Sequence, residues 1–247
     1  EQRLCLALAL WNGRDPILKE RAFGLTGNQG NRGEDVKERY FYLDATPSHS
    51  YLRYLYRYPQ GEYPYAELVA ENDRRDRGDP PFNLRDHRVW EAGFWDVTVT
   101  YAKAGPRTVH CRITAHNRGD QPAELHLLPT LWLRNTWAWD DEVGATRPRL
   151  AAARAPQGAG WAVRVDEAAL GACYLYGAGA AEPLFTENAT NQQRLFGVPN
   201  AEAYVKDAFH RRVVGGEETA VNPDQEGTKF AGWYLGRAEA GAAFSVD

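Results

Sequence analysis

A segment rich in glycine and asparagine, residues 24–37, carries the side chains best suited to binding chemistry. Glycine and asparagine tolerate a positive φ, which lets a loop bend sharply and bring its backbone close to another surface. Amide, carboxylate and ammonium groups supply the hydrogen-bond donors and acceptors that sugar hydroxyls require. The segment therefore predicts a loop at a substrate rim or at a domain interface, and its candidate residues are Asn28, Asn31, Glu34, Asp35 and Lys37.

Aromatic residues form a second feature of the chain. Eight tyrosines lie between Tyr40 and Tyr65, and Trp132, Trp137 and Trp139 follow later. Such rings offer flat apolar faces that stack on sugars. Two interpretations stay open: the rings are platforms of a carbohydrate-binding module, or the tyrosines pack within the domain that carries them. We retain Trp137 and Trp139 as candidates for the substrate rim or for an interdomain contact.

Acidic residues do not identify a catalytic pair in this sequence. Solvated turns and structural ion pairs also gather carboxylates, so a cluster by itself is weak evidence of acid–base chemistry. We assign no catalytic residue. The two densest clusters are Glu34, Asp35 and Glu38, and Asp140, Asp141 and Glu142.

Histidines suggest a less favoured alternative. His110 and His116 share one face of a predicted strand, and His126 is expected on the next strand. An aldose-epimerase-like enzyme would use histidine with an acid to open and close a sugar ring. Exposed strand faces often carry histidine, however, and analogy of fold alone does not assign a function.

Composition narrows the classes of partner. The 247 residues carry a net charge of −4 and no long basic run, which argues against a nucleic-acid or anionic-membrane partner. No run is apolar enough for a membrane span. Cys5, Cys111 and Cys173 are odd in number and widely spaced, so they predict buried thiols in a reducing, cytoplasmic setting. The sequence predicts no metal site and no cofactor.

The size of the chain fits one large β domain, residues 1–247. The sequence contains no methionine and begins in an apparent strand, so we expect it to be a fragment of a longer protein. Residues 44–90 are predicted to form an insertion of helices and loops. Within it, Ser48 is expected to cap a helix over residues 51–58, and a second helix is expected over residues 64–74.

Alternating apolar and polar residues predict the rest of the fold. Leu4–Trp11 is apolar on both faces, as in a strand buried on both sides, and residues 40–43 form a short strand. Residues 95–103, 108–117 and 123–137 predict three consecutive strands of an antiparallel meander. Further short strands follow, and Asn200 is expected to cap a helix over residues 201–212. The predicted class is mainly β: an antiparallel, supersandwich-like β-sandwich with a few short helices.

Five motifs together resemble glycoside hydrolase family 63, which includes mannosyl-oligosaccharide glucosidases and bacterial glucosidase-like proteins. The motifs recur in order over almost the whole chain: GNQGNRGEDVKERYFYLDATPSHSYLRYLYRYPQ, LHLLPTLWLRNTWAW, TENATNQQRLFG, AYVKDAFHRRVV and AVNPDQEGTKFAGWYL. The resemblance implies an N-terminal β-sandwich that packs on an (α/α)6 barrel, which hydrolyses α-glycosidic bonds with inversion.

The same resemblance places the general acid and base on the barrel, beyond Asp247. This chain would then be non-catalytic. It would scaffold its downstream helical domain and contribute a loop to the rim where an oligosaccharide binds. A stand-alone carbohydrate-binding sandwich is the alternative, and a purely structural role is a third possibility.

Overall fold

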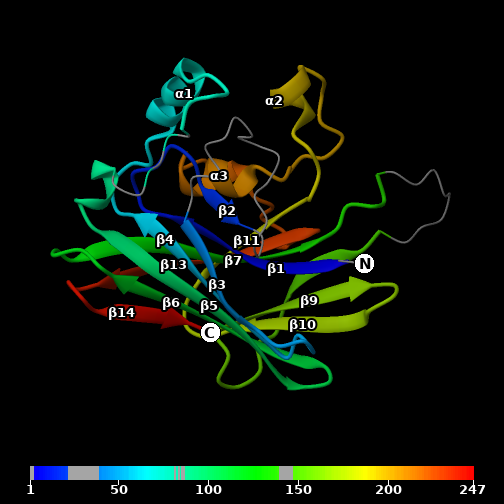
Figure 1. Ribbon diagram of the computed structural model, residues 1–247. Coiled ribbons are helices and arrows are strands. Elements are labelled where there is room, and N and C mark those ends of the chain that lie inside the picture. The colour runs from blue at the N-terminus through cyan, green and yellow to red at the C-terminus, as the bar shows by residue number, and fades with distance from the viewer. Residues whose placement is uncertain (1–2, 22–38, 81, 83, 85–86, 139–146) are drawn as a thin grey trace. The chain divides into compact units, whose positions relative to one another are not determined.

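The computed structural model describes residues 3–21, 39–80, 82, 84, 87–138 and 147–247 (Figure 1). The chain divides into two compact units. Unit 1 comprises Glu1–Trp11, Ile17–Phe23 and His126–Tyr234, and unit 2 comprises Asn12–Pro16, Gly24–Leu125 and Leu235–Asp247. Three antiparallel sheets and a few short helices make up the described part, so the predicted class, mainly β and sandwich-like, is confirmed.

The main sheet of unit 1 has the strand order β11-β13-β7-β1-β2. Strand β1 pairs along its whole length with β7, from Leu4 opposite Leu133 to Trp11 opposite His126. Its apolar residues on both faces suit this interior position and confirm the predicted strand. The strands are β1 (Leu4–Trp11), β2 (Lys19–Arg21), β7 (Ala123–Leu133), β11 (Glu182–Thr186) and β13 (Lys229–Ala238).

A second sheet of unit 1, with the order β10-β9-β8-β12, packs on one face of the main sheet. Leu131 and Phe230 of the main sheet share a core with Leu150 and Val163 of the second sheet. Gly177 and Gly232 leave space for the indole of Trp161, because a Cβ at either glycine would overlap that ring. The strands are β8 (Arg149–Ala153), β9 (Trp161–Glu167), β10 (Gly171–Gly177) and β12 (Glu226–Gly227).

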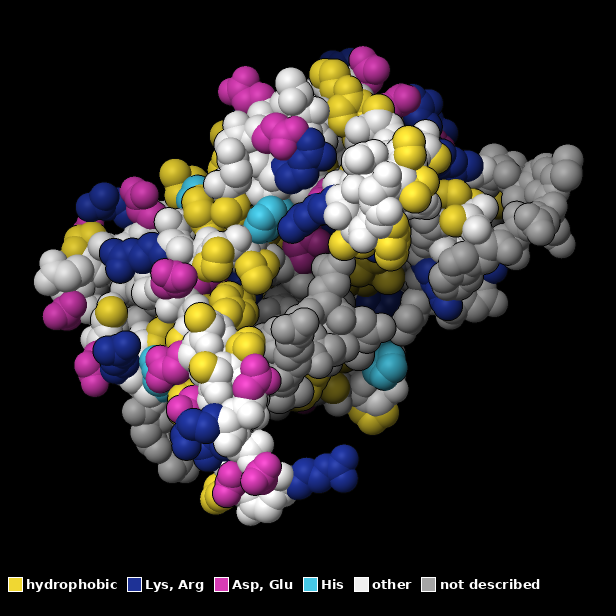
Figure 2. Space-filling model, turned by 90° about the horizontal axis from the view of Figure 1, so that it is seen from above, with side chains coloured by type: hydrophobic (Ala, Val, Ile, Leu, Met, Phe, Trp, Pro, Cys, Tyr) yellow, Lys and Arg dark blue, Asp and Glu magenta, His cyan; other side chains and the backbone are white. Residues whose placement is uncertain are grey.

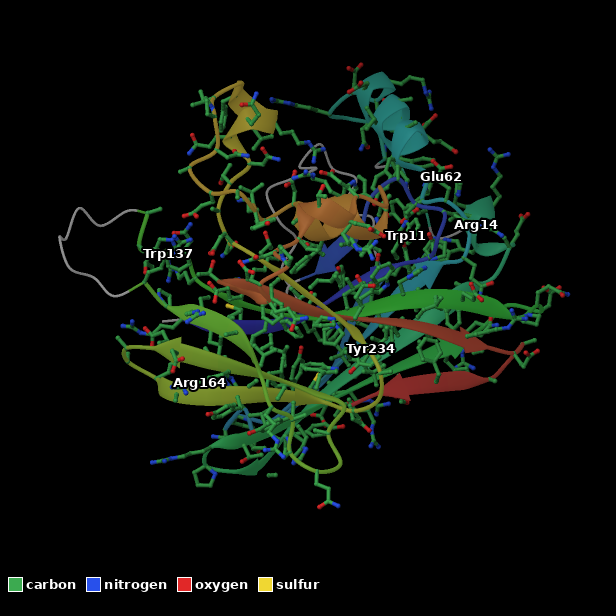
Figure 3. All side chains as sticks on the ribbon, turned by 180° about the vertical axis from the view of Figure 1, so that it is seen from behind. Trp11, Arg14, Glu62, Trp137, Arg164 and Tyr234 are labelled. Atoms are coloured by element: carbon green, nitrogen blue, oxygen red, sulfur yellow. The ribbon has the colours of Figure 1, made fainter. Side chains whose placement is uncertain are left out.

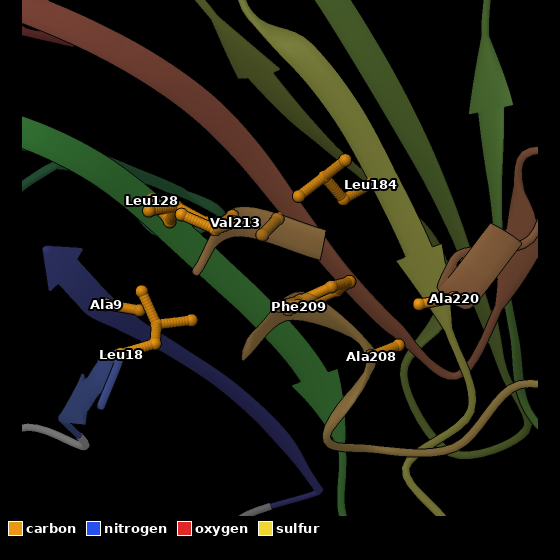
Figure 4. Packing of buried hydrophobic residues seen from close by; sticks show 9 residues of the cluster. Ala9, Leu18, Leu128, Leu184, Ala208, Phe209, Val213 and Ala220 are labelled. Carbon is orange, nitrogen blue, oxygen red and sulfur yellow. The ribbon is translucent and has the colours of Figure 1, made fainter. Parts of the chain in front are cut away.

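The opposite face of the main sheet is covered by helix α3 (Ala208–Val213) (Figure 4). Phe209 and Val213 pack on Leu128 and Leu184. Unit 1 also contains the helices α2 (Gln192–Phe196) and η4 (Glu218–Ala220).

The helix predicted over residues 201–212 is therefore wrong in its first half. The side-chain oxygen of Asn200 accepts from the amide of Gln193 in α2, and its own amide group donates to Asn191. Asn200 thus stabilises the segment that contains α2 and does not cap α3.

Unit 2 contains one five-stranded sheet, β14-β6-β5-β4-β3. Its buried face carries Tyr54, Tyr56, Trp95, Val97 and Ile113. The strands are β3 (Arg39–Ala45), β4 (Tyr51–Pro59), β5 (Phe94–Gly105), β6 (Thr108–Asn117) and β14 (Ala243–Val246). Strand β3 confirms the short strand predicted at residues 40–43.

The helix predicted over residues 51–58 is wrong, because this segment is strand β4. Tyr54, Tyr56 and Tyr58 are buried and alternate with more exposed residues, which is the period of a strand. Aromatic side chains also favour a pleated surface. Strand β4 therefore occupies part of the predicted insertion, and its last residue is Pro59.

Helix α1 (Tyr65–Arg74) confirms the second predicted helix to within one residue. Its buried Leu68 packs with Tyr63 and Leu84, and the short helix η3 (Arg88–Trp90) follows. The buried carboxylate of Asp15 accepts from the Tyr58 hydroxyl and from the backbone amide of Tyr63.

The three-strand meander predicted over residues 95–137 is only partly correct, and its last strand ends at Leu133. Strands β5 and β6 form a hairpin in unit 2, whereas β7 joins the main sheet beside β1. Residues 127–131 are all buried, so this strand needs cover on both faces. The main sheet of unit 1, with a second sheet on one face and α3 on the other, provides it.

The three cysteines are free and half-buried. Burial raises the pKa of all three thiols, most clearly for Cys111, whose pKa rises to about 12. They are therefore largely protonated thiols near neutral pH, as expected for packing residues.

Candidate functional site

Most of the residues predicted to bind substrate lie outside the described residues. These are Asn28, Asn31, Glu34, Asp35, Lys37 and Trp139, together with the acidic clusters around Glu38 and Asp140. Their roles stay predictions. Trp137 is described, and so are the residues that flank the two undescribed segments, 22–38 and 139–146.

Trp137 is half-buried and packs against the core between the two sheets of unit 1 (Figure 3). The guanidinium carbon of Arg147 lies 5.6 Å from the centre of its ring. One face of the indole therefore contacts a cation within the same unit, so this ring is not a free platform for a sugar.

The tyrosine-rich stretch is largely core. The exposed fractions of Tyr54, Tyr56, Tyr58 and Tyr63 are 3%, 1%, 0% and 2%. These four rings pack within unit 2 and cannot stack on a ligand. Tyr42, which is 64% exposed, is the most open ring among the described residues of this stretch.

The histidines do not gather at one site. His110 and His116 lie on β6, whereas His126 lies on β7 of another sheet. Nε2 of His116 is 3.0 Å from the carbonyl of Gly241, and Nδ1 of His126 accepts from the indole of Trp233 at 2.8 Å. His116 and His126 thus each have a local structural partner.

A polar network at the strand ends of unit 1 is the strongest candidate site. Its centre is Glu187, directly after β11, whose carboxylate accepts from Thr228 at 2.6 Å and pairs with Arg147 at 2.8 Å. Arg147 also pairs with Glu202 at 2.6 Å. We call Arg147, Glu187, Glu202 and Thr228 the Arg147 network.

Asn188 and Asn135 extend the Arg147 network to β7. The amide of Asn188 donates to the carbonyl of Leu133, and that of Asn135 donates to the carbonyl of Asn188. The hydroxyl of Thr228 accepts from the backbone amide of Asn188. Segments from the ends of β7 and β11 and the start of β13 are thereby fixed to one another.

A second group, which we call the Lys229 cage, lies next along β13. The ammonium group of Lys229 donates to both carboxylate oxygens of Glu20, at 2.8 and 3.0 Å, and to the carbonyl of Lys206 at 2.8 Å. It also lies 4.8 Å from the centre of the Phe209 ring. The Lys229 side chain is only 7% exposed, so these contacts replace its hydration.

The electrostatics of both groups are those of paired charges. Burial by itself lowers the pKa of Arg147, but Glu202 and Glu187 outweigh it and raise the pKa above its ordinary value. The guanidinium therefore stays charged. Glu187 and Glu202 are thus paired to Arg147, and Glu20 is paired to Lys229.

His210 connects helix α3 to the segment before β2. Its Nδ1 accepts from the backbone amide of Leu18 at 3.2 Å, which requires an unprotonated Nδ1. Burial and the charge of Arg194 lower its pKa below 6.5, against the opposing charges of Glu20 and Asp207. The folded protein therefore favours the neutral ring.

This lowered pKa predicts a loss of stability in acid. As pH falls below 6.5, the unfolded chain takes up the proton at His210 before the folded chain does, so the free energy of unfolding decreases. We expect the melting temperature to fall more steeply between about pH 7 and 5 in the wild type than in His210→Asn, whose side-chain oxygen keeps an acceptor but does not titrate. Melting curves across this range check it, and parallel curves would contradict it.

The sequence patterns did not predict the residues of the Arg147 network or of the Lys229 cage as site residues. Glu187 and Asn188 lie in TENATNQQRLFG, Thr228 and Lys229 lie in AVNPDQEGTKFAGWYL, and Lys206 lies in AYVKDAFHRRVV. The sequence feature that could have indicated them is the presence of polar residues at the ends of apolar strands. Their pairing was not visible, because Lys229 and Glu20 are 209 positions apart.

Among curated proteins, the chain is similar to the uncharacterized protein YMR196W of Saccharomyces cerevisiae, with 38% identity over 267 aligned residues. The match covers 95% of this chain and 24% of the relative, so the chain spans about a quarter of that protein's length. No family model and no solved structure matches the chain.

Two further observations limit the kinds of site in the described part of the chain. Its histidines, cysteines and acidic residues form no group of three placed to hold a metal ion. None of its helices combines the length and apolarity needed to cross a membrane. On the face shown in Figure 2, acidic and basic side chains are intermixed.

Proposed function

We propose that this chain is the non-catalytic N-terminal β-sandwich region of a larger, glucosidase-like inverting α-glycosidase. In this role it scaffolds a helical catalytic domain and contributes loops to the rim of an oligosaccharide site. The five sequence motifs support the family. The match to about a quarter of a longer relative supports a place within a larger protein.

One observation carries the proposed rim role. Glu20 precedes the candidate loop at residues 24–37, and Trp137 and Arg147 flank residues 139–146. All three take part in the contacts at the strand ends: Glu20 in the Lys229 cage, and Trp137 against Arg147 of the network. The described residues near both segments are thus held by charge pairs or by a cation–ring contact. Such anchoring suits loops that must present polar groups to a substrate.

In this proposal, unit 1 has a structural role, whereas the candidate loop binds substrate and the catalytic domain carries out the reaction. Glu20, Glu187 and Glu202 are paired to cations, so unit 1 fixes geometry. Asn28, Asn31, Asp35 and Lys37 would bind sugar hydroxyls, while the acid and base come from the catalytic domain. We place the protein in a reducing compartment such as the cytoplasm, because its three cysteines are free.

A stand-alone carbohydrate-binding module is the second candidate. It would require open aromatic rings, yet four tyrosines of the predicted platform are buried and Trp137 contacts Arg147. Trp132 is also half-buried. These observations favour the scaffold role.

Kinetics on the full-length parent protein test the proposal. We expect the isolated 247-residue chain to hydrolyse no α-glucoside or α-mannoside, whereas the parent does. In the parent, Asn31→Ala and Asp35→Ala should raise KM or lower kcat about tenfold, with little change in melting temperature. Asp120→Ala, in an exposed turn of unit 2, is the matched control and should leave both unchanged.

Two outcomes would overturn this assignment. A parent without glycosidase activity would remove the catalytic context altogether. A lower melting temperature with unchanged kcat/KM in the loop variants would make the loop an interdomain clamp, and the substrate role would be withdrawn.

A further inference from the structure

The outer face of the unit 2 sheet forms an open groove of about 480 Å³. Its walls come from four strands and the turn after β6. Asp96, Thr98 and Thr100 of β5 form its floor, with side chains of β4 and β6 on either side. The lining is Leu43, Arg53, Leu55, Asp96, Thr98, Thr100, Arg112, Thr114, His116 and Arg118.

Strand register arranges these side chains in three rows across the sheet. Arg53, Thr100 and Arg112 lie opposite one another in the first row. Neighbouring strands are about 4.8 Å apart, so the two arginine backbones lie about 10 Å apart with a hydroxyl between them. The second row is Leu55, Thr98, Thr114 and Ser245, and the third is Arg57, Asp96 and His116.

The charge of the groove is positive although the chain is acidic. The charged residues around the groove are Arg39, Arg53, Arg57, Arg112 and Arg118 against Asp44, Asp96 and Asp247, so five positive charges against three negative ones leave two. The whole chain carries −4. An excess of arginine in a groove favours anions, and the guanidinium fork matches carboxylate and phosphate oxygens.

The charge pairs leave one arginine available. Asp96 accepts from Arg57 at 2.8 Å and from Arg118 at 3.1 Å, and Asp247 accepts from Arg112. Arg53 is exposed, and its guanidinium has no ion pair or hydrogen bond among the described residues. Its forked donors therefore face the groove with an open binding capacity.

Hydroxyl groups fill the middle of the groove. Thr114 and Ser245 hydrogen-bond to each other at 2.8 Å, while the side chains of Thr98 and Thr100 have no partner among the described residues. A row of hydroxyls beside an arginine matches a ligand that carries several hydroxyls and one anionic group. The ten lining residues include no aromatic ring, and the nearest exposed ring of this face is Phe41, opposite Leu55 at the edge of the groove.

We propose that this groove binds a small polyhydroxylated anion, a sugar phosphate or a sugar acid, with Arg53 on the anionic group and Thr98 and Thr100 on hydroxyls. The site is separate from the proposed glycosidase rim, and its test needs no enzymatic activity. Binding would weaken as salt rises, because the groove is open to solvent.

Calorimetric titration of the 247-residue chain tests the site with four probes: glucose 6-phosphate, glucuronate, glucose and inorganic phosphate. We expect glucose 6-phosphate or glucuronate to bind, and glucose and inorganic phosphate to bind at least about tenfold more weakly. The stronger of the two binders identifies phosphate or carboxylate as the anionic group.

Substitutions locate the site. Arg53→Ala should weaken binding about tenfold or more, and Thr98→Val should weaken it severalfold at nearly equal volume. Arg164→Ala, on β9 of unit 1, removes the same charge from another surface and should bind as the wild type does (Figure 3). Far-UV circular dichroism verifies folding, and Arg53→Lys replaces Arg53→Ala if that variant unfolds.

Any of four results would overturn the proposal. The first is that neither anionic sugar binds. The second is that Arg53→Ala and Arg53→Lys bind as tightly as the wild type. The third is that Arg164→Ala weakens binding as much as Arg53→Ala. Equal affinity for inorganic phosphate would likewise show a general attraction of anions and not a site for a polyhydroxylated ligand.

Discussion

Replacing Glu20 by alanine is expected to lower the free energy of unfolding by about 3–5 kcal/mol, because it leaves a buried ammonium group without its counter-charge. Lys229 is 7% exposed at its side chain, whereas Glu20 is 39% exposed. In Glu20→Ala the ammonium keeps only the carbonyl of Lys206 and the ring of Phe209. Chemical denaturation of both proteins measures the difference.

The unequal exposure of the two partners predicts an order among variants. Lys229→Met should be milder than Glu20→Ala, because the remaining carboxylate is partly solvated and methionine fills the apolar space. Asp166→Ala is the control: it removes the partner of Arg164, and both of these side chains are about half exposed. It should change stability by less than about 1 kcal/mol. If the Glu20→Ala and Asp166→Ala variants were equally stable, Glu20 would not be the stabilising counter-charge of a buried Lys229.

Phe230→Ala is expected to destabilise the protein as much as Glu20→Ala does. It should lower the free energy of unfolding by about 3–5 kcal/mol. The Phe230 ring is fully buried between the two sheets of unit 1, with the rings of Phe185 and Trp161 centred 5.0 and 5.1 Å away. Its removal leaves a cavity that these rings fill only in part. Thermal and urea unfolding would record the loss.

Phe196→Ala is the matched substitution for this test. Phe196 lies in α2 and is 70% exposed, so its truncation should stay within about 0.5 kcal/mol of the wild type. If Phe230→Ala were as mild as Phe196→Ala, the two sheets would not share the core described here.

The sequence predicted strands where burial alternates or is complete. Strand β1 was identified because every position is apolar, and β5 and β6 were identified because the period is two. Strand β4 was missed because Ser48 before it and Pro59 at its end resemble helix boundaries, although its tyrosines also alternate. The partner of β7 was missed because a short turn does not show that the next strand stays in the same sheet.

The candidate site was less accessible to prediction than the fold. Composition drew attention to a glycine-rich segment, but composition does not show which charges pair. Thr228 meets Glu187 across 41 positions, and Lys229 meets Glu20 across 209. The register of β13 with β11 places Thr228 beside Glu187, whereas Glu20 lies on β2, which the sheet order separates from β13 by β7 and β1. The strand ends are thus defined by topology, and local sequence patterns carry little information about them.

The Arg147 network also bears on how such a protein can diverge. Arg147 pairs with both Glu187 and Glu202, and its guanidinium lies against the ring of Trp137. A substitution at Arg147 would therefore remove three contacts at once, and the effects of changes at these four positions would not be additive. We expect such linked positions to change together among relatives, whereas a half-exposed pair such as Arg164 and Asp166 can change one residue at a time.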